Sequence, residues 1–431
     1  YGLVDLLTTY ASLIAVVIGL QKSQAVFRFL VTCRDDEHRL REISSTVILE
    51  TIVIFVGYII VFLLVHPFIT IDYKWFLLIY VLASIFLQTA AGIARGLGNN
   101  TVYAAGNFIS AFVMIVLNIL FVAIMRLGVS AMLVSQIVGP LIGGTYIFVC
   151  TRIWKYFDIK AANKKDMKMV MNYAIPLVPN ELSWTVIHSS DRRIISTFVS
   201  IAANGLIAVA AKISAIYTTF FSIFNTSWTE QVVLHYKDEG GPEYVCEMFD
   251  KMITLFASIA IGIIVCIPLI FTIIVNESFT EAYGLIPWYM IAVFFNAVIG
   301  MISAIYLVEN ETKQVAFSTM AAAVINVVVD FALVNQIGMY AAPISSICGY
   351  MAISFWRLWD VNKRHCRITM SRKKLLLLIV MLATAIASYY SRKIWSVVAG
   401  LIFVAAVALA LNYRFLMEFA GMFRKERGES K

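Results

Sequence analysis

The chain has 431 residues, of which 61% are hydrophobic and only 14% are charged, and its mean hydropathy is +0.85. Soluble globular proteins carry about 25% charged residues, so this chain has too few polar groups to cover a surface in water. The composition excludes a set of soluble domains and predicts a protein that crosses a membrane many times. The formal net charge of +8 does not indicate nucleic-acid binding, because the basic residues follow the membrane topology described below.

Thirteen apolar stretches are long enough to cross a hydrocarbon layer about 30 Å thick, which takes about 20 residues of helix. They cover residues 3–32, 45–67, 75–97, 101–125, 128–151, 173–200, 204–234, 251–275, 284–308, 313–336, 339–359, 375–391 and 394–418. Lipid offers no hydrogen bonds to an exposed backbone, so spans of this length should be helices. We therefore predict an all-α polytopic membrane protein.

Alternate connections between these spans differ in their content of basic residues. One set holds 25 of the 34 Lys and Arg residues, and five more lie inside spans. The opposite set holds only Lys74, Arg126, Arg392 and Lys393. Cytoplasmic connections accumulate Lys and Arg, so we predict that the basic set and the C-terminus are cytoplasmic and that Tyr1 lies outside.

The basic connection 152–172 divides the chain near its middle. From Trp154 to Asn172 its lysines are interleaved with apolar residues, which predicts an amphipathic helix on the cytoplasmic face. We expect an N-terminal lobe at 1–151, a second lobe at 173–362, a basic loop at 363–374, an extra helix pair at 375–418 and a cytoplasmic tail at 419–431.

The two halves show an internal repeat. At a shift of 210 residues, five identities fall within twelve positions: Gly128, Ala131, Ser135, Ile137 and Gly139 match Gly338, Ala341, Ser345, Ile347 and Gly349. Both halves keep one orientation, as in transporters built from parallel repeats. The partner of span 173–200 would precede Tyr1, so we expect a complete protein of fourteen helices, of which this chain has the last thirteen.

Motifs of enzymes and of metal or nucleotide sites are missing from the sequence. It contains no H-E-x-x-H, no P-loop lysine and no Gly-rich nucleotide fingerprint. The six cysteines are scattered and form no C-x-x-C pair, so we expect packing residues rather than disulfides or a zinc site. These features predict a protein that is not an enzyme and that uses no ATP and no cofactor.

Five basic residues inside spans are the candidate substrate-binding residues: Lys22, Arg28, Arg192, Arg193 and Lys212. A charge in the bilayer costs a few kcal/mol and usually faces the bundle interior or a water-filled cavity. Ammonium and guanidinium groups suit an anionic phosphate headgroup. As alternatives, Arg28 could extend to the lipid headgroups, and either Arg192 or Arg193 could pair with a neighbouring acid.

Four deep acids, Glu181, Asp191, Glu230 and Asp330, are candidates to neutralise these cations or to bind a coupling H⁺ or Na⁺. Two prolines, Pro176 and Pro179, interrupt the backbone ladder early in span 173–200 and predict a hinge.

Three segments resemble the Wzx-type polysaccharide flippases of the multidrug/oligosaccharidyl-lipid/polysaccharide (MOP) exporter superfamily. They are Tyr1-Gly-Leu-Val-Asp-Leu-Leu-Thr-Thr, Gln24-Ala-Val-Phe-Arg-Phe, and Tyr173-Ala-Ile-Pro-Leu-Val-Pro-Asn followed by His188-Ser-Ser-Asp-Arg-Arg. The resemblance implies two six-helix repeats in a V-shaped arrangement plus two C-terminal helices. It also implies alternating-access movement of undecaprenyl-pyrophosphate-linked oligosaccharide to the outer leaflet of a bacterial plasma (inner) membrane.

Two other functions remain open at this point. A cation-coupled multidrug exporter of the same superfamily would rely on the deep acids. A membrane-embedded polysaccharide polymerase or ligase would need a sizeable external loop, and the external connections are short. The expected partners are the lipid-linked glycan, membrane lipids and other polysaccharide-assembly proteins, with no nucleic acid.

Overall fold

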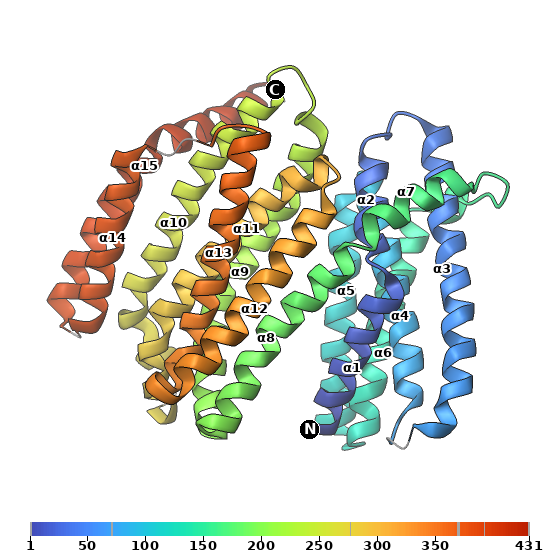
Figure 1. Cartoon of the computed structure of the whole chain (residues 1–431), viewed down its shortest axis with the longest axis horizontal. Coiled ribbons are helices and arrows are strands. Elements are labelled where there is room, and N and C mark those ends of the chain that lie inside the picture. Colours follow the sequence, from blue (N-terminus) through green and yellow to red (C-terminus); the bar gives the residue numbers. More distant parts are fainter. Residues whose placement is uncertain (1, 70–71, 276, 369–370, 392, 430–431) are drawn as a thin grey trace. The chain divides into compact units, whose positions relative to one another are not determined.

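A computed structural model describes residues 2–69, 72–275, 277–368, 371–391 and 393–429, and every regular element in these ranges is a helix (Figure 1). The prediction of an all-α protein is confirmed. Tyr1 and Arg392, which the sequence places on the external side, lie outside the described residues.

Ten helical ranges in the described parts of the chain are long and apolar enough to cross a membrane, or up to eleven if the bent pair of α1 (Gly2–Gly19) and α2 (Lys22–Val31) is one span. One range, Thr312–Arg364, contains two helices, α12 (Thr312–Ile337) and α13 (Ala341–Arg364). The predicted span 173–200 is not among the ten, and its helix α8 (Leu177–Phe198) carries several charged residues. The number thirteen stays a prediction.

The chain forms two compact units. Unit 1 comprises residues 1–182 and 309–316, and unit 2 comprises residues 183–308 and 317–431. The division falls inside α8, whereas the sequence places the start of the second lobe at residue 173. The lobe boundaries drawn from the sequence therefore stay predictions.

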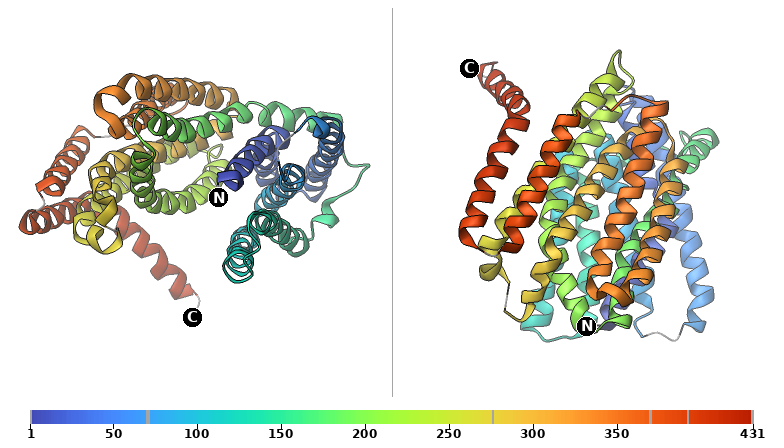
Figure 2. Two further views of the ribbon diagram at one scale, coloured as in Figure 1. Left: turned by 90° about the horizontal axis from the view of Figure 1, so that it is seen from below. Right: turned by 60° about the vertical axis from the view of Figure 1, so that its left-hand side comes forward.

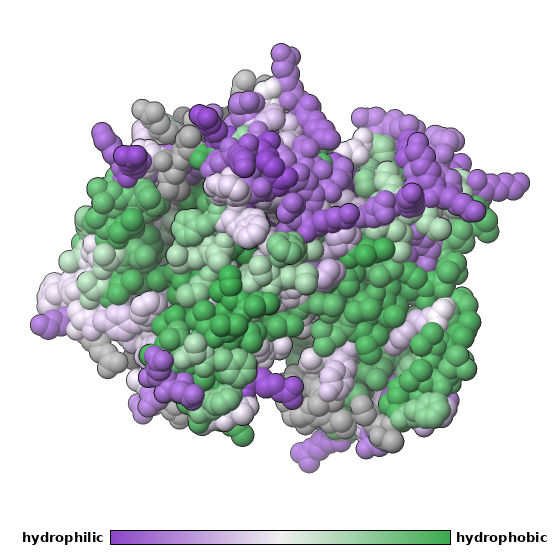
Figure 3. Space-filling view, viewed as in Figure 1, coloured by the Kyte–Doolittle hydropathy of each residue, from purple (hydrophilic) through white to green (hydrophobic). Residues whose placement is uncertain are grey.

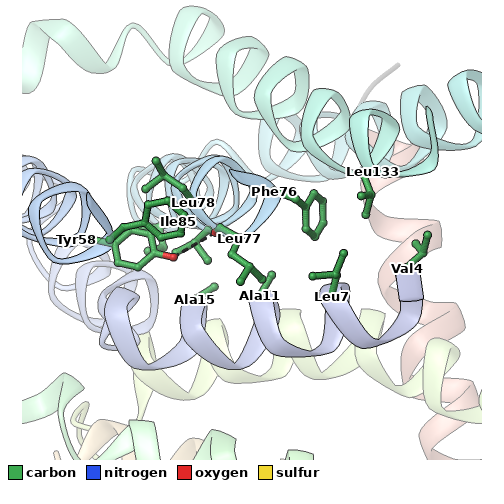
Figure 4. Close-up of a cluster of buried hydrophobic side chains, with 12 residues drawn as sticks. Val4, Leu7, Ala11, Ala15, Tyr58, Phe76, Leu77, Leu78, Ile85 and Leu133 are labelled. Atoms are coloured by element: carbon green, nitrogen blue, oxygen red, sulfur yellow. Dashed lines mark hydrogen bonds between the residues drawn. The ribbon is translucent and has the colours of Figure 1, made fainter. Parts of the chain in front are cut away.

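Unit 1 is built on α1 to α7. After α1 and α2 come α3 (Glu37–Val65), α4 (Trp75–Gly96), α5 (Asn100–Asn118), a π-helical turn (Ile119–Ile124), α6 (Val129–Cys150) and α7 (Lys164–Ala174). Its core joins α1, α3, α4 and α6 (Figure 4). The small side chains Ala11 and Ala15 of α1 are buried there, and the Tyr58 hydroxyl of α3 donates to the Leu77 carbonyl of α4 at 3.2 Å. Small residues let membrane helices approach closely.

Unit 2 holds most of α8 and the remaining helices. These are α9 (Ile201–His235), α10 (Gly241–Ile274), the 3-10 segment Glu277–Leu285, α11 (Ile286–Val308), α12, α13, α14 (Arg372–Ser391) and α15 (Ile394–Glu429). A core of buried side chains joins α8, α11, α12 and α13. The last two helices pack on each other and on α10 (Figure 2).

The surface shows the pattern of a membrane protein. In Figure 3 hydrophobic residues cover the middle of the helices, and hydrophilic residues gather at their upper ends, over the segments with the basic connections. We call this the basic side. The chain is thus a multi-pass membrane protein.

The repeated glycines have the same role in each unit. A Cβ on Gly139 of α6 would lie 2.6 Å from the Ser110 carbonyl oxygen of α5, and a Cβ on Gly349 of α13 would lie 3.1 Å from the Ala322 carbonyl oxygen of α12. Each glycine therefore permits close approach of the preceding helix. This supports the internal repeat.

The linker departs from the single amphipathic helix that the sequence predicts between Trp154 and Asn172. A 3-10 turn at Ile153–Tyr156 is followed by non-helical residues, and α7 begins only at Lys164. The Asn163 side chain accepts from the Asp166 backbone N–H at 2.8 Å, which caps α7. Asp166 in turn accepts two bonds from the Arg39 guanidinium of α3, at 3.0 and 3.1 Å, which ties the linker to unit 1.

The cysteine prediction is wrong for one pair. Cys246, near the start of α10, and Cys366, just after α13, form a disulfide with a Cα–Cα distance of 6.5 Å. This pair could not be predicted from the sequence because 120 residues separate its members. Only the fold brings these two helix ends together on the basic side. The other four described cysteines are not disulfide-bonded.

Candidate functional site

The first candidate region lies at the break between α1 and α2. The two helices meet at 46°, and the residues between them, Leu20 and Gln21, have left-handed φ values of 50° and 52°. Non-glycine residues in this region cost of order 1–3 kcal/mol each, and such strain clusters at functional sites. The expected continuous helix over 3–32 is wrong here, because α1 ends at Gly19 and the two left-handed residues that follow interrupt the helix. Broken helices carry the binding sites of many transporters.

Lys22 is the first residue of α2, directly after this break. It is 2% exposed, and its Nζ lies 3.1 Å from Oε2 of Glu50 on α3, which is 8% exposed. Glu50 Oε1 has no hydrogen-bond partner among the described residues. Lys22 is thus held in a buried ion pair, and contact with a substrate would require this pair to open. Its substrate-binding role stays a prediction.

Two glycines of α4 hold α2 in place. A Cβ on Gly92 would lie 2.6 Å from the Ser23 carbonyl oxygen, and a Cβ on Gly96 would lie 2.6 Å from the Cβ of Leu30. The spacing of four residues puts both glycines on one face of α4, where they let the backbone of α2 approach. The position of Lys22 is therefore fixed by close helix packing.

Arg28 lies further along α2 and is 5% exposed. Its electrostatic neighbours in unit 1 include Tyr173 and Glu309. The guanidinium is therefore surrounded by protein rather than extended to the lipid headgroups, which disfavours the headgroup alternative.

The other three predicted cations lie in unit 2 and are exposed: Arg192 and Arg193 on α8, and Lys212 on α9. Lys212 is eleven residues from the start of α9, or about 17 Å along the helix at 1.5 Å per residue. This depth is well inside a hydrocarbon layer about 30 Å thick. Charged side chains at this depth usually face the bundle interior or a water-filled cavity, so the exposed Lys212 is a candidate to line such a cavity.

Hydroxyl groups continue the exposed face of α9 from Lys212 toward the C-terminal end of the helix. Thr219 and Ser222 are exposed, and Thr226 is half-buried one turn further on. Spacings of seven, three and four residues place all four side chains on one side of the helix. Each hydroxyl donates to a carbonyl of its own helix, at 2.8 to 2.9 Å, and keeps acceptor capacity. These hydroxyls were not predicted as site residues, although their helical spacing from Lys212 is visible in the sequence.

The second candidate region in unit 2 is an acidic cluster. Asp330 of α12 is fully buried, and neither carboxylate oxygen has a hydrogen-bond partner among the described residues. Asp191 of α8 is 7% exposed and accepts from the Ser346 hydroxyl at 3.0 Å, rather than pairing with the neighbouring arginines. Asn326 lies one turn before Asp330 and donates to the Ser345 hydroxyl at 3.2 Å.

Asp330 and Asp191 could hold a cation. An isolated ionised carboxylate away from water is very costly, and the cluster offers carboxylate oxygens that have no hydrogen-bond partner among the described residues. No group of three or more Cys, His, Asp and Glu side chains in the described ranges is placed to hold a metal ion. A proton or an alkali cation fits the oxygen-rich donor set better than a transition metal does.

The remaining predicted residues belong to none of the regions described above. Glu181 is half-buried on α8 and belongs to unit 1, and Glu230 is 7% exposed on α9. Pro176 occupies the break between α7 and α8, and Pro179 lies in the first turn of α8, where its missing N–H costs nothing. The hinge role stays a prediction.

One cation counted with the basic connections lies inside the bundle. Arg357, one of those 25 basic residues, is 1% exposed on α13. Its guanidinium donates to the hydroxyls of Ser303, Ser318 and Thr319 at 2.7 to 2.9 Å. The hydroxyls come from α11 and α12, so the sequence around Arg357 gives no sign of this site.

Comparisons with known proteins identify the family. The sequence profile of a family described as "Polysaccharide biosynthesis protein" matches residues 1–229, more than half of the chain. No curated protein matches the chain significantly.

Solved transporters share the fold. An outward-facing multidrug resistance MATE family transporter of the MOP superfamily is 16% identical, with a TM-score of 0.66 over 84% of this chain and 86% of that one. A MATE transporter crystallised with MaL6 is 15% identical, with a TM-score of 0.68 over 84% and 88%. A MOP superfamily transporter from Pyrococcus furiosus, described as having a binding pocket of reverse polarity, is 13% identical, with a TM-score of 0.66 over 84% and 87%.

The match over more than half of the chain shows the family, and the solved structures show the fold. The chain belongs to the polysaccharide biosynthesis protein family, and it shares the fold of transporters of the MOP superfamily.

Proposed function

We propose that the protein is an alternating-access flippase that moves undecaprenyl-pyrophosphate-linked oligosaccharide from the cytoplasmic to the outer leaflet of a bacterial plasma membrane, for surface polysaccharide assembly. The basic side is then cytoplasmic, together with the C-terminus, in accordance with the distribution of Lys and Arg. The protein acts as a transporter and makes or breaks no bond in its substrate.

The observation that carries this proposal is the exposed face of α9, which carries Lys212 and, toward the basic side, Thr219, Ser222 and Thr226. An ammonium group binds a pyrophosphate, and hydroxyl side chains exchange hydrogen bonds with sugar hydroxyls. The two kinds of side chain occur together on one helix at membrane depth. This combination suits a headgroup that carries phosphate and sugar, whereas a cationic drug would be repelled by Lys212.

An ion gradient supplies the driving force in this proposal. Asp330 and Asp191 would take up H⁺ or Na⁺, because Asp330 lacks a hydrogen-bond partner among the described residues and an unpaired buried carboxylate is costly. Cation binding at the cluster and substrate binding along α9 would then be coupled through unit 2, which contains both. No ATP-binding motif occurs in the sequence.

A cation-coupled multidrug exporter is the second candidate. The same acidic cluster favours it, and one structure with this fold is described as a multidrug resistance transporter. The Lys212 face counts against it, because many exported drugs are cations. A polymerase or ligase is less favoured, because the external connections are short.

Photocrosslinking tests the substrate path directly. A benzophenone amino acid at Thr219 should capture a polyprenyl-pyrophosphate oligosaccharide added to liposomes that contain the protein. The matched control is Phe112 of α5, an exposed apolar position on a membrane helix of the other unit. We expect glycan adducts at Thr219, few at Phe112, and a loss of the Thr219 adducts in Lys212→Ala. Equal capture at the two positions, or capture unaffected by Lys212→Ala, would refute the proposal.

A further inference from the structure

A pocket of about 440 Å³ lies among α10, α14 and α15, three helices that carry none of the candidate residues described above. Its polar lining comes from Lys251 and Thr254 of α10, Lys374 of α14, and Asn412 and Tyr413 of α15. No Asp or Glu is among the described residues that line it. The volume lies within the range of about 300–1,000 Å³ that is typical of small-molecule sites.

The pocket lies at the edge of the hydrocarbon layer. Lys251 directly precedes the charge-free stretch 252–275 of α10, and Lys374 directly precedes the charge-free stretch 375–391 of α14. Tyr413 ends the candidate membrane span Ile394–Tyr413 of α15. All three helices thus enter the membrane at the pocket, on the basic side (Figure 1). Lipid phosphates lie at this level.

Polar contacts join the three helices around the pocket. Lys374 Nζ lies 2.5 Å from Asp250 Oδ2, which joins α14 to α10. One or two turns deeper, Asn412 Nδ2 donates to the Ser258 hydroxyl at 3.1 Å, which joins α15 to α10. Thr254 and Asn412 are buried, at 2% and 4% exposed. The polar lining is therefore built into the packing of the three helices.

The lysines can still bind an anion. Lys251 Nζ lies 3.2 Å from Glu247 Oε1 on the preceding turn. The side chain of Lys251 is 25% exposed, and that of Lys374 is 34% exposed. An ammonium group has three N–H donors, so a lysine next to one carboxylate can also donate to a phosphate oxygen. Basic pockets between membrane helices on the cytoplasmic side are suited to anionic lipid headgroups.

We propose that this pocket binds the phosphate-bearing headgroup of an anionic phospholipid from the leaflet on the basic side. Lys251 and Lys374 contact the phosphate, and the acyl chains leave the pocket along the apolar surfaces of α14 and α15, where Leu376 and Leu409 are among the exposed side chains. The bound lipid joins the last two helices to α10. This site is separate from the path of the transported substrate and does not depend on the proposed function.

Native mass spectrometry of the purified full chain tests the proposal. Phosphatidylglycerol, phosphatidylcholine, undecaprenyl phosphate and inorganic phosphate are titrated separately. The double variant Lys251→Gln/Lys374→Gln is compared with Lys165→Gln/Lys373→Gln, which removes the same charge from exposed positions outside the pocket. Thermal unfolding without lipid shows that both variants fold.

We expect one tightly retained phosphatidylglycerol, with affinity reduced about tenfold in the pocket variant and unchanged in the control variant. Equal retention by the two variants, or equal retention of phosphatidylcholine, would overturn the proposal. Preferential retention of undecaprenyl phosphate would assign the pocket to the transported lipid instead, and competition by inorganic phosphate at equal concentration would assign it to free phosphate. Both results would refute a phospholipid site.

Discussion

The buried pair of Lys22 and Glu50 gives the sharpest prediction about stability. At 3.1 Å and an effective dielectric constant of about 20, two unit charges attract by about 5 kcal/mol. Desolvation opposes most of this gain, so the intact pair adds little net stability. A partner left alone keeps the desolvation cost without the attraction. We therefore expect Lys22→Met to lower the free energy of unfolding by about 3–5 kcal/mol, and Glu50→Gln to do the same.

The double variant Lys22→Met/Glu50→Gln should differ from the wild type by only about 1 kcal/mol, because it buries no unpaired charge. Unfolding in mixed micelles, followed by circular dichroism, measures the four corners of this double-mutant cycle. Lys212→Met is the control, since Lys212 is exposed, and should change stability by less than about 1 kcal/mol. Additive effects of the two single substitutions would refute the reasoning. The double variant also separates folding from function: if Lys22 contacts the substrate, this variant is folded but inactive.

Three further predictions concern packing and the linker. Gly92→Ala should lower the free energy of unfolding by about 1–3 kcal/mol, because the new Cβ would lie 2.6 Å from a backbone oxygen of α2. Gly57→Ala is the control and should leave the free energy of unfolding unchanged, because a Cβ there has no atom within 4 Å. Equal melting temperatures of the two variants would contradict this prediction. Arg39→Ala removes both guanidinium bonds to Asp166 and should speed proteolysis between residues 157 and 163, and an unchanged cleavage rate would count against a tied linker. In Arg357→Lys the ammonium group lacks the fork geometry with which the guanidinium reaches three hydroxyls. This variant should lower the free energy of unfolding by about 1–3 kcal/mol in the same assay, and an unchanged free energy would refute a stabilising role of Arg357.

Helix positions could be predicted well from the sequence because apolar length and flanking charge are local properties. The predicted spans 75–97 and 128–151 differ by one residue at most from α4 and α6 at each end. Span 173–200 fits less well, because its charged residues leave α8 outside the helices that are apolar enough to be candidate membrane spans. The break at Leu20 was not predicted because Gly19 is its only signal in the sequence, and a single glycine inside an apolar span does not by itself indicate a break.

The candidate sites could be predicted only in part. Ionisable residues inside spans are visible in the sequence, so Lys22, Lys212 and Asp330 could be named as candidates. The partner of Lys22 could not be named, because Lys22 meets Glu50 through the fold, from 28 positions away in the chain. Exposure could not be assigned either: Lys22 is buried and Lys212 is exposed, although both lie in apolar helices.

Leaflet transfer tests the central claim most directly. The protein is reconstituted in liposomes that carry a fluorescent polyprenyl-pyrophosphate oligosaccharide in one leaflet. A membrane-impermeant quencher reports the arrival of this lipid in the other leaflet, and the assay is repeated with an imposed H⁺ or Na⁺ gradient. We predict transfer that an ion gradient accelerates and that Lys212→Ala abolishes, while Lys165→Ala, an exposed linker variant, transfers at the wild-type rate. Absence of transfer by folded protein across several glycans, together with gradient-driven export of cationic drugs, would contradict the account.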